Sequence, residues 1–600
     1  MNTDIQSRIL QNTGSREITE IEHIQPLWNN YGMLSRVYLR GNPAYPSVIV
    51  KHIQIPDKKI HPRGFTSDFS RLRKIKSYQV EAYWYQHYNH FVTGSISSPT
   101  PKCLEVFDSE NELFLLMEDL KNRGYSENLY EADWIQVSSV LSWLASFHAQ
   151  FMNYEPEGIW SCGTYWHLAT RPEELRNIQG TELHRLSSFF NARLQQCNYQ
   201  TFDHGDAKLA NFCFHNNLQQ VAAVDFQYVG KGCGMKDVAY FIGSCLQSEQ
   251  SEVLEAKILD FYFSELTKFL KDSDIDVQKL EYEWRNMYHL AWADFQRFLL
   301  GWSPHHRKLN NYSQRCTEQV SEQIFTEIQD TVTRACKEAG KFIFQNWKEQ
   351  SQREIFSKGF VDSRASDIVT NIDIQAQKII LEILEPLNAK YDLGILAEEG
   401  QHNNSRLEKH AFFAIDPLDG TLHFVEGKSG FATSIALVLK SGQSLLGAVY
   451  DPVHDNLYQA TRGRGFFVNG ERMEPSPQSS HKERITLFAD RSLQKHSLFE
   501  VLQTNCDVQF AGGAVINVVQ VIMNALSCYC KPPKKSLGGC AIWDLAAVSV
   551  MLEEMQGNTL FFDGTPLHLN RDQSIYFNDV GLVFTCLGVS YDQCIELFQQ

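Results

Sequence analysis

The chain has 600 residues, more than one ordinary hydrophobic core can organise, and its 43% hydrophobic content is that of a soluble globular protein. Its formal net charge of −16 argues against general nucleic-acid binding, because phosphate backbones are bound mainly by Lys and Arg. No apolar run approaches the roughly 20 residues that cross a bilayer, and no signal peptide is evident at the N-terminus. We therefore expect a multidomain cytoplasmic protein with neither nucleic acid nor membrane as a partner.

Fourteen cysteines are scattered along the chain without paired CxxC spacing. This distribution is typical of reduced thiols in a cytosolic protein. Cys528, Cys530 and Cys540 form the densest group, but no second Cys or His pair follows them, so metal binding there is the less favoured interpretation.

The first half of the chain changes from a strand-rich to a helix-rich pattern. Residues 48–53 and 113–117 have strand character. From Trp134 onwards apolar residues recur every three to four positions, behind the acidic Glu131 and Asp133, which predicts an amphipathic helix. A small strand-rich part followed by a larger helical part fits a two-lobed, kinase-like architecture.

A group of polar residues typical of a kinase catalytic loop follows. His204, Gly205 and Asp206 precede Asn211, and Asp225 comes after a short connection. Asp206 can orient and accept the proton of an attacking hydroxyl, and Asn211 and Asp225 can bind Mg²⁺ that bridges nucleotide phosphates. An isolated Asp after Gly could be a turn residue. Here its two partners arrive with it, which favours the kinase interpretation.

These motifs resemble the aminoglycoside phosphotransferase and choline kinase superfamily, particularly its ecdysteroid-kinase-like branch, over about residues 20–300. The resemblance implies a bilobal fold and phosphorylation of a small-molecule hydroxyl by ATP with Mg²⁺. It also implies that further residues contact ATP: Lys51 at the phosphates, Glu81 as the partner of Lys51, Gly32 and Ser35 in a reduced phosphate-covering loop, and Glu118 in the adenine hinge. The less favoured interpretation of Lys51 is a solvated lysine at a sheet edge. Gln227 replaces an acidic residue that many relatives carry.

A polar, turn-rich stretch at residues 301–312 predicts a domain boundary, with domains at 1–311 and 312–600. Beyond it, the pattern predicts a long amphipathic helix over 317–347 and a buried one over 515–526. Strand and turn signals occupy 394–469, and a last helix begins at Asp544 and stops at Gly557. Lys531, Lys534 and Lys535 are most simply a solvated loop, and contact with a substrate phosphate is the less favoured interpretation.

Carboxylates from several segments of this second half could form one site. Asp416 and Asp419 end a short apolar strand, Glu398 lies upstream, and Asp544 lies downstream. Such a set can hold two hard cations side by side, which is phosphatase chemistry. Asp544 alone could be a helix N-cap, but the other carboxylates favour a ligand.

Four segments occur in an order similar to that of the inositol monophosphatase superfamily: 367–373 (DIVTNID), 398–399 (EE), 416–421 (DPLDGT) and 543–544 (WD). The similarity runs from about 318 to 585 and implies an αβαβα sandwich. The predicted fold class is therefore α+β and α/β, with a bilobal kinase-like domain followed by a layered sugar-phosphatase-type domain. A homodimer is compatible with this assignment.

The resemblance also implies roles in a site with two or three Mg²⁺ ions. One ion would be bound by Glu398, Asp416 and the Leu418 carbonyl, and a second by Asp416, Asp419 and Asp544; Asp373 with Thr421 would orient the attacking water, and the amides of Gly420 and Thr421 would hold the phosphate. Leu537 departs from the family, which usually has a hydroxyl-binding Glu at this position. The metal ligands are thus complete, whereas inositol recognition is altered.

We therefore expect a fusion of an ATP-dependent small-molecule kinase with a Mg²⁺-dependent phosphomonoesterase that acts on an inositol phosphate or a related sugar phosphate. One alternative is that only the phosphatase is catalytic and the kinase-like domain binds a nucleotide or another ligand. Another is that the phosphatase half acts on 3′-phosphoadenosine 5′-phosphate.

Overall fold

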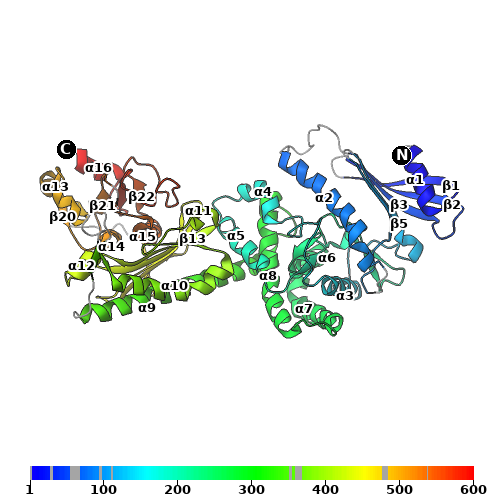
Figure 1. Cartoon of the computed structure of the whole chain (residues 1–600), viewed down its shortest axis with the longest axis horizontal. Helices are drawn as coiled ribbons and strands as arrows, with labels where there is room; N and C mark the ends of the chain where they lie inside the picture. Colours follow the sequence, from blue (N-terminus) through cyan, green and yellow to red (C-terminus); the bar gives the residue numbers. More distant parts are fainter. Residues whose placement is uncertain are drawn as a thin grey trace. The chain divides into compact units, whose positions relative to one another are not determined.

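The computed structural model describes residues 3–27, 31–54, 68–93, 97–109, 112–349, 355–357, 368–475, 484–536 and 538–599. The chain divides into two compact units, Met1–Ser321 and Glu322–Gln600. The division falls within the long helix α9 (Asn311–Lys348), which is drawn in green in Figure 1.

A five-stranded antiparallel sheet begins the first unit. Its strands, in the order β1-β2-β3-β5-β4, span Glu17–Pro26 (β1), Gly32–Arg40 (β2), Ser47–Gln54 (β3), Cys103–Asp108 (β4) and Glu112–Glu118 (β5). Helix α1 (Thr3–Thr13) packs its apolar side against the sheet face that carries Val50. Because side chains alternate along a strand, Lys51 points to the opposite face. There it meets Glu81 of helix α2 (Asp68–His87).

Helices form the rest of the first unit: α3 (Trp134–Gln150), α4 (Pro172–Asn177), α5 (Glu182–Gln195), α6 (Met235–Cys245), α7 (Ser248–Leu270) and α8 (Val277–Trp302). Asp133 caps α3 through a capping box with Gln136, which stabilises the predicted start of this helix. Two short strand pairs lie among the helices: β6 (Thr201–Asp203) with β9 (Gly230–Gly232), and β7 (Phe212–Phe214) with β8 (Val221–Ala223). The predicted catalytic loop therefore runs between β6 and β7.

Two sheets form the centre of the second unit. In the seven-stranded sheet β12 is parallel to β13 and the other neighbours are antiparallel; its strands are β12 (Gly394–Ala397), β13 (Ala411–Asp419), β14 (Ala432–Leu439), β15 (Ser444–Asp451), β16 (Asn456–Thr461), β17 (Gly465–Val468) and β18 (Glu471–Met473). The five-stranded sheet has the order β20-β19-β21-β23-β22, with β19 (Thr486–Phe488), β20 (Asp507–Gln509), β21 (Ser527–Lys531), β22 (Asn558–Phe561) and β23 (Leu582–Thr585). A separate hairpin pairs β10 (Ile355–Ser357) with β11 (Ile368–Thr370).

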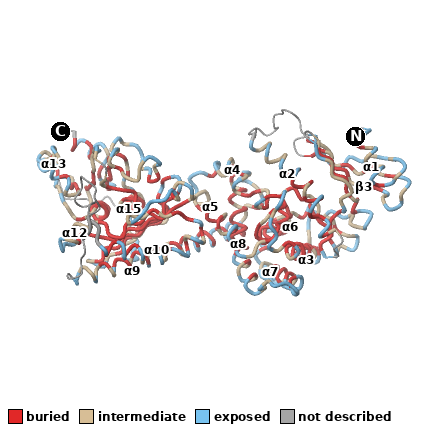
Figure 2. The backbone as a smooth tube through the Cα atoms, viewed as in Figure 1, coloured by how far each residue is buried: buried red, intermediate tan, exposed pale blue. Residues whose placement is uncertain are grey.

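Helices and sheets alternate in layers in this unit. Helices α9 and α10 (Asn371–Tyr391) cover one face of the seven-stranded sheet, and α15 (Ile542–Glu554) covers the other (Figure 1). Helix α14 (Ala514–Met523) lies with α15 between the two sheets, and α13 (Phe499–Asn505) and α16 (Tyr591–Gln599) pack on the five-stranded sheet. The central strands are buried along their whole length (Figure 2). Two short helices, α11 (Ser405–Glu408) and α12 (Thr421–Val425), complete the unit.

The mixed α and β character predicted from the sequence is confirmed. The predicted turn-rich stretch separates α8 from α9, although the division between units lies farther along, because the first turns of α9 pack with α7 and α8. The predicted last helix begins at Ile542 instead of Asp544, since Asp544 reaches back to accept a hydrogen bond from the Ala541 amide at 2.8 Å. All fourteen cysteines are free thiols. Among the described residues, no helix combines the length and apolarity that a membrane span requires.

Candidate active sites

The end of strand β13 presents the first carboxylate of the second unit. Asp416 is only 1% exposed, and its Oδ1 accepts a hydrogen bond from the Leu418 amide at 3.0 Å. The ladder between β13 and β14 is irregular between Asp416 and Asp419. Such an irregularity redirects side chains at the end of a strand, and it leaves both carboxylates at this edge of the sheet.

Three carboxylates from three elements converge there. Oxygen atoms of Asp416, Asp419 and Asp544 lie within 4.8 Å of one another. Asp419 also accepts hydrogen bonds from the amides of Ala514 and Val515, at 3.1 and 2.9 Å, so the first turn of α14 holds it in place. These short separations are the distances at which one or two cations could share the three groups.

Burial and neighbouring carboxylates raise the pKa values of all three carboxyls of the trio. Burial raises the pKa of Asp416 well above its usual value, and the neighbouring Glu398, Asp419 and Asp544 raise it further. Burial and Asp544 do the same to the pKa of Asp419. Partial burial, with Glu398, raises the pKa of Asp544 to about 7. Three closely packed carboxylates offer the oxygen donors that Mg²⁺ prefers.

The remaining predicted residues of this half lie on neighbouring turns. Glu398 follows β12 and donates its amide to the Ile415 carbonyl at 3.1 Å, which keeps it beside β13. The hydroxyl of Thr421 donates to the Leu418 carbonyl at 3.1 Å. Asp373 is buried in the first turn of α10.

Gly420 occupies a position that only glycine can take. Its φ is +82°, in the left-handed region, and a Cβ atom there would lie 2.7 Å from the Gly430 carbonyl oxygen. A side chain at this position would therefore collide with the backbone of Gly430. Leu537 and Asp367 lie outside the described residues.

Two groups beside the trio were missed by sequence reasoning. The Lys531 ammonium donates to Asp490 at 2.6 Å and to the Cys540 sulfur at 3.1 Å. The predicted solvated loop is therefore wrong for Lys531, which lies on β21 in a partly buried ion pair. The Lys531 charge opposes the rise in the pKa of Asp544, whereas the Asp490 charge adds to the rise in the pKa of Asp419. No motif marks either residue, because the pairing of β19, which precedes Asp490, with β21, which carries Lys531, brings them together only through the fold.

In the first unit, three charged residues meet beneath the sheet. The Lys51 ammonium donates to Glu81 Oε2 at 2.6 Å and to Asp225 Oδ1 at 3.3 Å. Lys51 and Glu81 are 5% and 1% exposed. The alternative of a solvated lysine at a sheet edge therefore does not apply to Lys51.

The predicted catalytic loop is rigidly held by hydrogen bonds. The Asn211 side-chain amide donates to the backbone carbonyl of Asp206 at 2.8 Å and to its carboxylate Oδ2 at 3.0 Å. The amides of His204 and Gly205 donate to the Asp237 carboxylate, at 2.5 and 3.0 Å. These bonds fix the loop from both sides.

Asp225 has a left-handed backbone with φ of +70° and lies among cations. Burial raises its pKa, but Lys51, Lys208 and Lys74 outweigh burial and hold the pKa below its usual value. Gln227 donates to Asp225 Oδ1 at 2.6 Å and accepts from Lys74 at 2.6 Å. The glutamine that departs from the family pattern thus links Asp225 to a lysine.

Gly32, Ser35 and Glu118, predicted to contact ATP, lie on strands. Gly32 begins β2, where a Cβ atom would lie 1.9 Å from a carbonyl oxygen of β3. Ser35 lies inside β2 instead of in a loop, and its hydroxyl shares a hydrogen bond of 3.0 Å with His23. Residues 28–30, which precede β2, lie outside the described residues. Glu118 ends β5.

Comparisons with known proteins confirm both resemblances. Residues 325–586 match the inositol monophosphatase family, and residues 162–275 match the ecdysteroid kinase-like family. The inositol-1-monophosphatase of Bacillus subtilis is 28% identical over 257 residues, which cover 42% of this chain and 91% of that protein. The Nus factor SuhB of Salmonella typhimurium is 29% identical over 238 residues, which cover 38% of this chain and 84% of that protein.

Among solved structures, the extragenic suppressor protein suhB of Bartonella henselae shares 22% identity, covers 46% of this chain and 99% of its own, and has a TM-score of 0.38. The expected absence of nucleic-acid binding finds no support in these comparisons. ATP and the bilobal kinase layout stay predictions.

Proposed function

We propose that this chain, with one inositol monophosphatase-family half and one ecdysteroid kinase-like half, is a bifunctional enzyme. The second half would hydrolyse a small phosphomonoester with Mg²⁺, and the first would transfer a phosphoryl group from ATP to a small-molecule hydroxyl. The observation that carries the proposal is the convergence of Asp416, Asp419 and Asp544 within 4.8 Å, inside the family match at 325–586.

In the phosphatase half, the oxygen donors fit Mg²⁺ in two sets. Glu398, Asp416 and the Leu418 carbonyl would hold one ion, and Asp416, Asp419 and Asp544 another. Bound Mg²⁺ supplies charge neutralisation of the phosphate and a lowered pKa for a coordinated water. The protein's own part is to place these oxygens rigidly.

The water and the phosphate would be positioned by the turn that follows β13. Thr421 already directs its hydroxyl at the Leu418 carbonyl, so its lone pairs face outward to accept from a water. Asp373 would take the proton of that water. The amides of Gly420 and Thr421 would hold phosphate oxygens, because the left-handed Gly420 leaves no side chain in the way.

In the kinase half, Asp206 would accept the proton of the acceptor hydroxyl. Its Oδ2 is held by Lys208 at 2.9 Å and by Asn211 at 3.0 Å, which fixes the orientation of the carboxylate. Lys51, fixed by Glu81, would contact the ATP phosphates. Asn211 and Asp225 would bind Mg²⁺ with ATP.

A single experiment tests both activities. The full-length protein is incubated with ATP, Mg²⁺ and a metabolite panel, and phosphate release and ADP formation are recorded together. We expect both signals, with Asp416→Asn removing only the first and Asp206→Asn only the second. Absence of phosphate release from every phosphomonoester in the panel would refute the phosphatase assignment.

Two alternatives have distinct signatures in the same experiment. If the first half only binds nucleotide through Lys51 and Asp225, ATP binds without ADP formation on any acceptor. The partly buried Lys531 beside the carboxylate trio favours testing 3′-phosphoadenosine 5′-phosphate, whose second phosphate could pair with a lysine. Preferential hydrolysis of that compound would select this alternative.

A further inference from the structure

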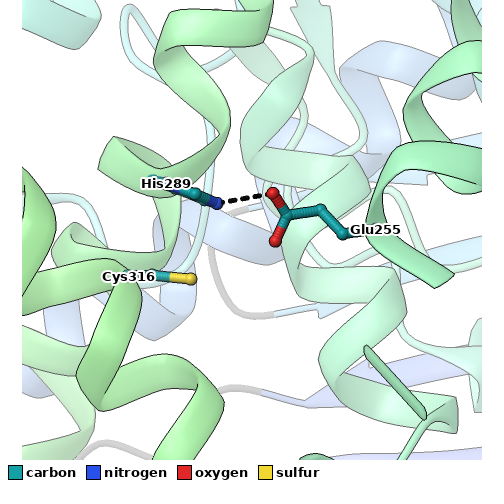
Figure 3. Close-up of side chains that lie close together, drawn as sticks. All are labelled: Glu255, His289 and Cys316. Carbon is teal, nitrogen blue, oxygen red and sulfur yellow. Dashed lines mark hydrogen bonds and ion pairs between the residues drawn. The ribbon is translucent and has the colours of Figure 1, made fainter. Parts of the chain in front are cut away.

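Three helices of the first unit bring together a carboxylate, an imidazole and a thiol outside both predicted active sites. Glu255 lies on α7, His289 on α8 and Cys316 in the early turns of α9, and their side chains point toward one another (Figure 3). One potential ligand atom from each residue lies within 4.8 Å of the other two. His289 Nε2 and Glu255 Oε1 are 2.8 Å apart.

This combination of side chains is chemically suited to Zn²⁺. Zinc binds Cys sulfur, His nitrogen and carboxylate oxygen, and a site with three protein ligands keeps a fourth position for water. Tetrahedral bonds of about 2.0–2.3 Å place ligand atoms roughly 3.3–3.8 Å apart. The separations here, from 2.8 Å to at most 4.8 Å, bracket that range, so small side-chain rotations suffice.

The surroundings hold Glu255 as a metal-binding carboxylate is usually held. The Tyr312 hydroxyl donates to Glu255 Oε2 at 2.7 Å, which leaves Oε1 directed at His289. Such supporting hydrogen bonds orient metal ligands. Arg315 is the cation nearest to this carboxylate in the described contacts, at 3.7 Å from Oε2, and it also pairs with Glu252 at 3.3 Å. Its charge is therefore shared between two carboxylates.

Burial leaves a route for a cation and protects the thiol. The side chains of His289 and Glu255 are 20% and 23% exposed, whereas Cys316 is fully buried beneath them. A metal could reach the imidazole and carboxylate from solvent and then close onto the sulfur.

We propose that Glu255, His289 and Cys316 form a Zn²⁺ site that fastens the start of α9 to α7 and α8. Cys316 binds as a thiolate and His289 through a deprotonated Nε2, so binding releases protons and weakens as the pH falls. The simpler interpretation, a His289–Glu255 ion pair with the Cys316 thiol hydrogen-bonded to His289 and no metal bound, is the outcome that would overturn the proposal.

Cobalt distinguishes the two interpretations, because thiolate ligation produces a near-ultraviolet charge-transfer absorption that oxygen ligands do not. The chelator-treated full-length protein is titrated with Co²⁺. We expect this absorption in the unmodified protein, its displacement by Zn²⁺, and its loss in Cys316→Ser. The matched control is Cys245→Ser, since in the described contacts Cys245 donates to carbonyls of its own helix, Phe241 O at 3.4 Å and Ile242 O at 3.7 Å. Cobalt in the Asp416 trio does not produce the absorption.

A second variant keeps the test decisive if Cys316→Ser folds poorly. His289→Gln should shift the midpoint of the cobalt titration to at least about tenfold higher concentration, because losing a direct ligand should cost at least as much affinity as losing a group that only supports a ligand. The control His184→Gln, on α5, should leave the midpoint unchanged. No thiolate absorption in the unmodified protein, or an unchanged titration in His289→Gln, would refute the site.

Discussion

Asp416→Asn should eliminate phosphatase activity and at the same time stabilise the metal-free protein. Asparagine keeps the shape of the side chain and can still accept the 3.0 Å hydrogen bond from the Leu418 amide. It removes one negative charge from a buried group that contains Glu398, Asp419 and Asp544. The substitution therefore separates the function of the charge from the structure of the turn.

The loss of phosphatase activity and the gain in metal-free stability have different physical causes. Asp416 belongs to both proposed metal sets, so activity should fall on the order of 10³-fold or more, corresponding to at least about 4 kcal/mol. The folded protein raises the pKa of this carboxyl, so its contribution to stability falls as the pH rises above the unfolded value. Near pH 7, metal-free Asp416→Asn should therefore be more stable than the unmodified metal-free protein.

Activity is measured as phosphate release at saturating Mg²⁺, and stability as urea unfolding in the presence of a chelator. The matched control is Asp563→Asn, in an exposed turn where the side chain accepts from the Thr565 amide at 2.9 Å. The control should change neither quantity. Retention of activity by Asp416→Asn would refute the metal assignment, and a loss of metal-free stability would refute the electrostatic reasoning.

Three further predictions concern other parts of the chain. Asp206→Asn should abolish ADP formation and leave phosphate release nearly intact, because the two sites lie in separate compact units; loss of both activities in a folded variant would contradict this. Leu537→Glu, at a position outside the described residues, should increase kcat/KM for myo-inositol monophosphate relative to other phosphomonoesters by roughly 10- to 150-fold, since it restores a charge-assisted hydrogen bond; an unchanged ratio would count against the role of Leu537. Burial lowers the pKa of His167 to about 4, so between about pH 6.5 and 4 the unfolded chain binds a proton that the native state does not, and stability falls as the pH drops through this window. His167→Gln should remove up to about 3 kcal/mol of that loss in urea titrations at pH 7 and pH 4.5, and identical pH profiles would refute the assignment.

The carboxylates of the phosphatase half could be predicted because each belongs to a short motif whose backbone carries it to the site. Asp416 and Asp419 end an apolar strand, and the strand pairing then places Glu398 beside them. The same holds for Asp206 and Asn211, which lie on one turn and bond to each other directly. Local geometry, which sequence spacing encodes, decides these contacts.

Contacts made by tertiary packing left no such signal. Lys531 reaches the phosphatase site only because β21 runs beside β19, which precedes Asp490. Cys316 meets Glu255 only through the packing of three helices. Ser35 was expected in a phosphate-covering loop, but pairing with both β1 and β3 extends β2 over it, so strand pairing outweighed the loop pattern.

The two sites differ in how far their carboxylates are neutralised by neighbouring side chains, and this difference predicts different responses to Mg²⁺. Around Asp416 the pKa values of three carboxyls are raised, because the groups are buried and repel one another. Around Asp225 the pKa is lowered, because lysines already neutralise the carboxylate. Mg²⁺ alone should therefore bind the phosphatase half and raise its unfolding midpoint, whereas the kinase half needs the nucleotide phosphates to complete a cation site. Urea unfolding of Asp416→Asn and Asp206→Asn, with Mg²⁺ alone and with Mg²⁺ and ATP, measures this. Stabilisation by Mg²⁺ alone that persists in Asp416→Asn would show that the charge argument is wrong.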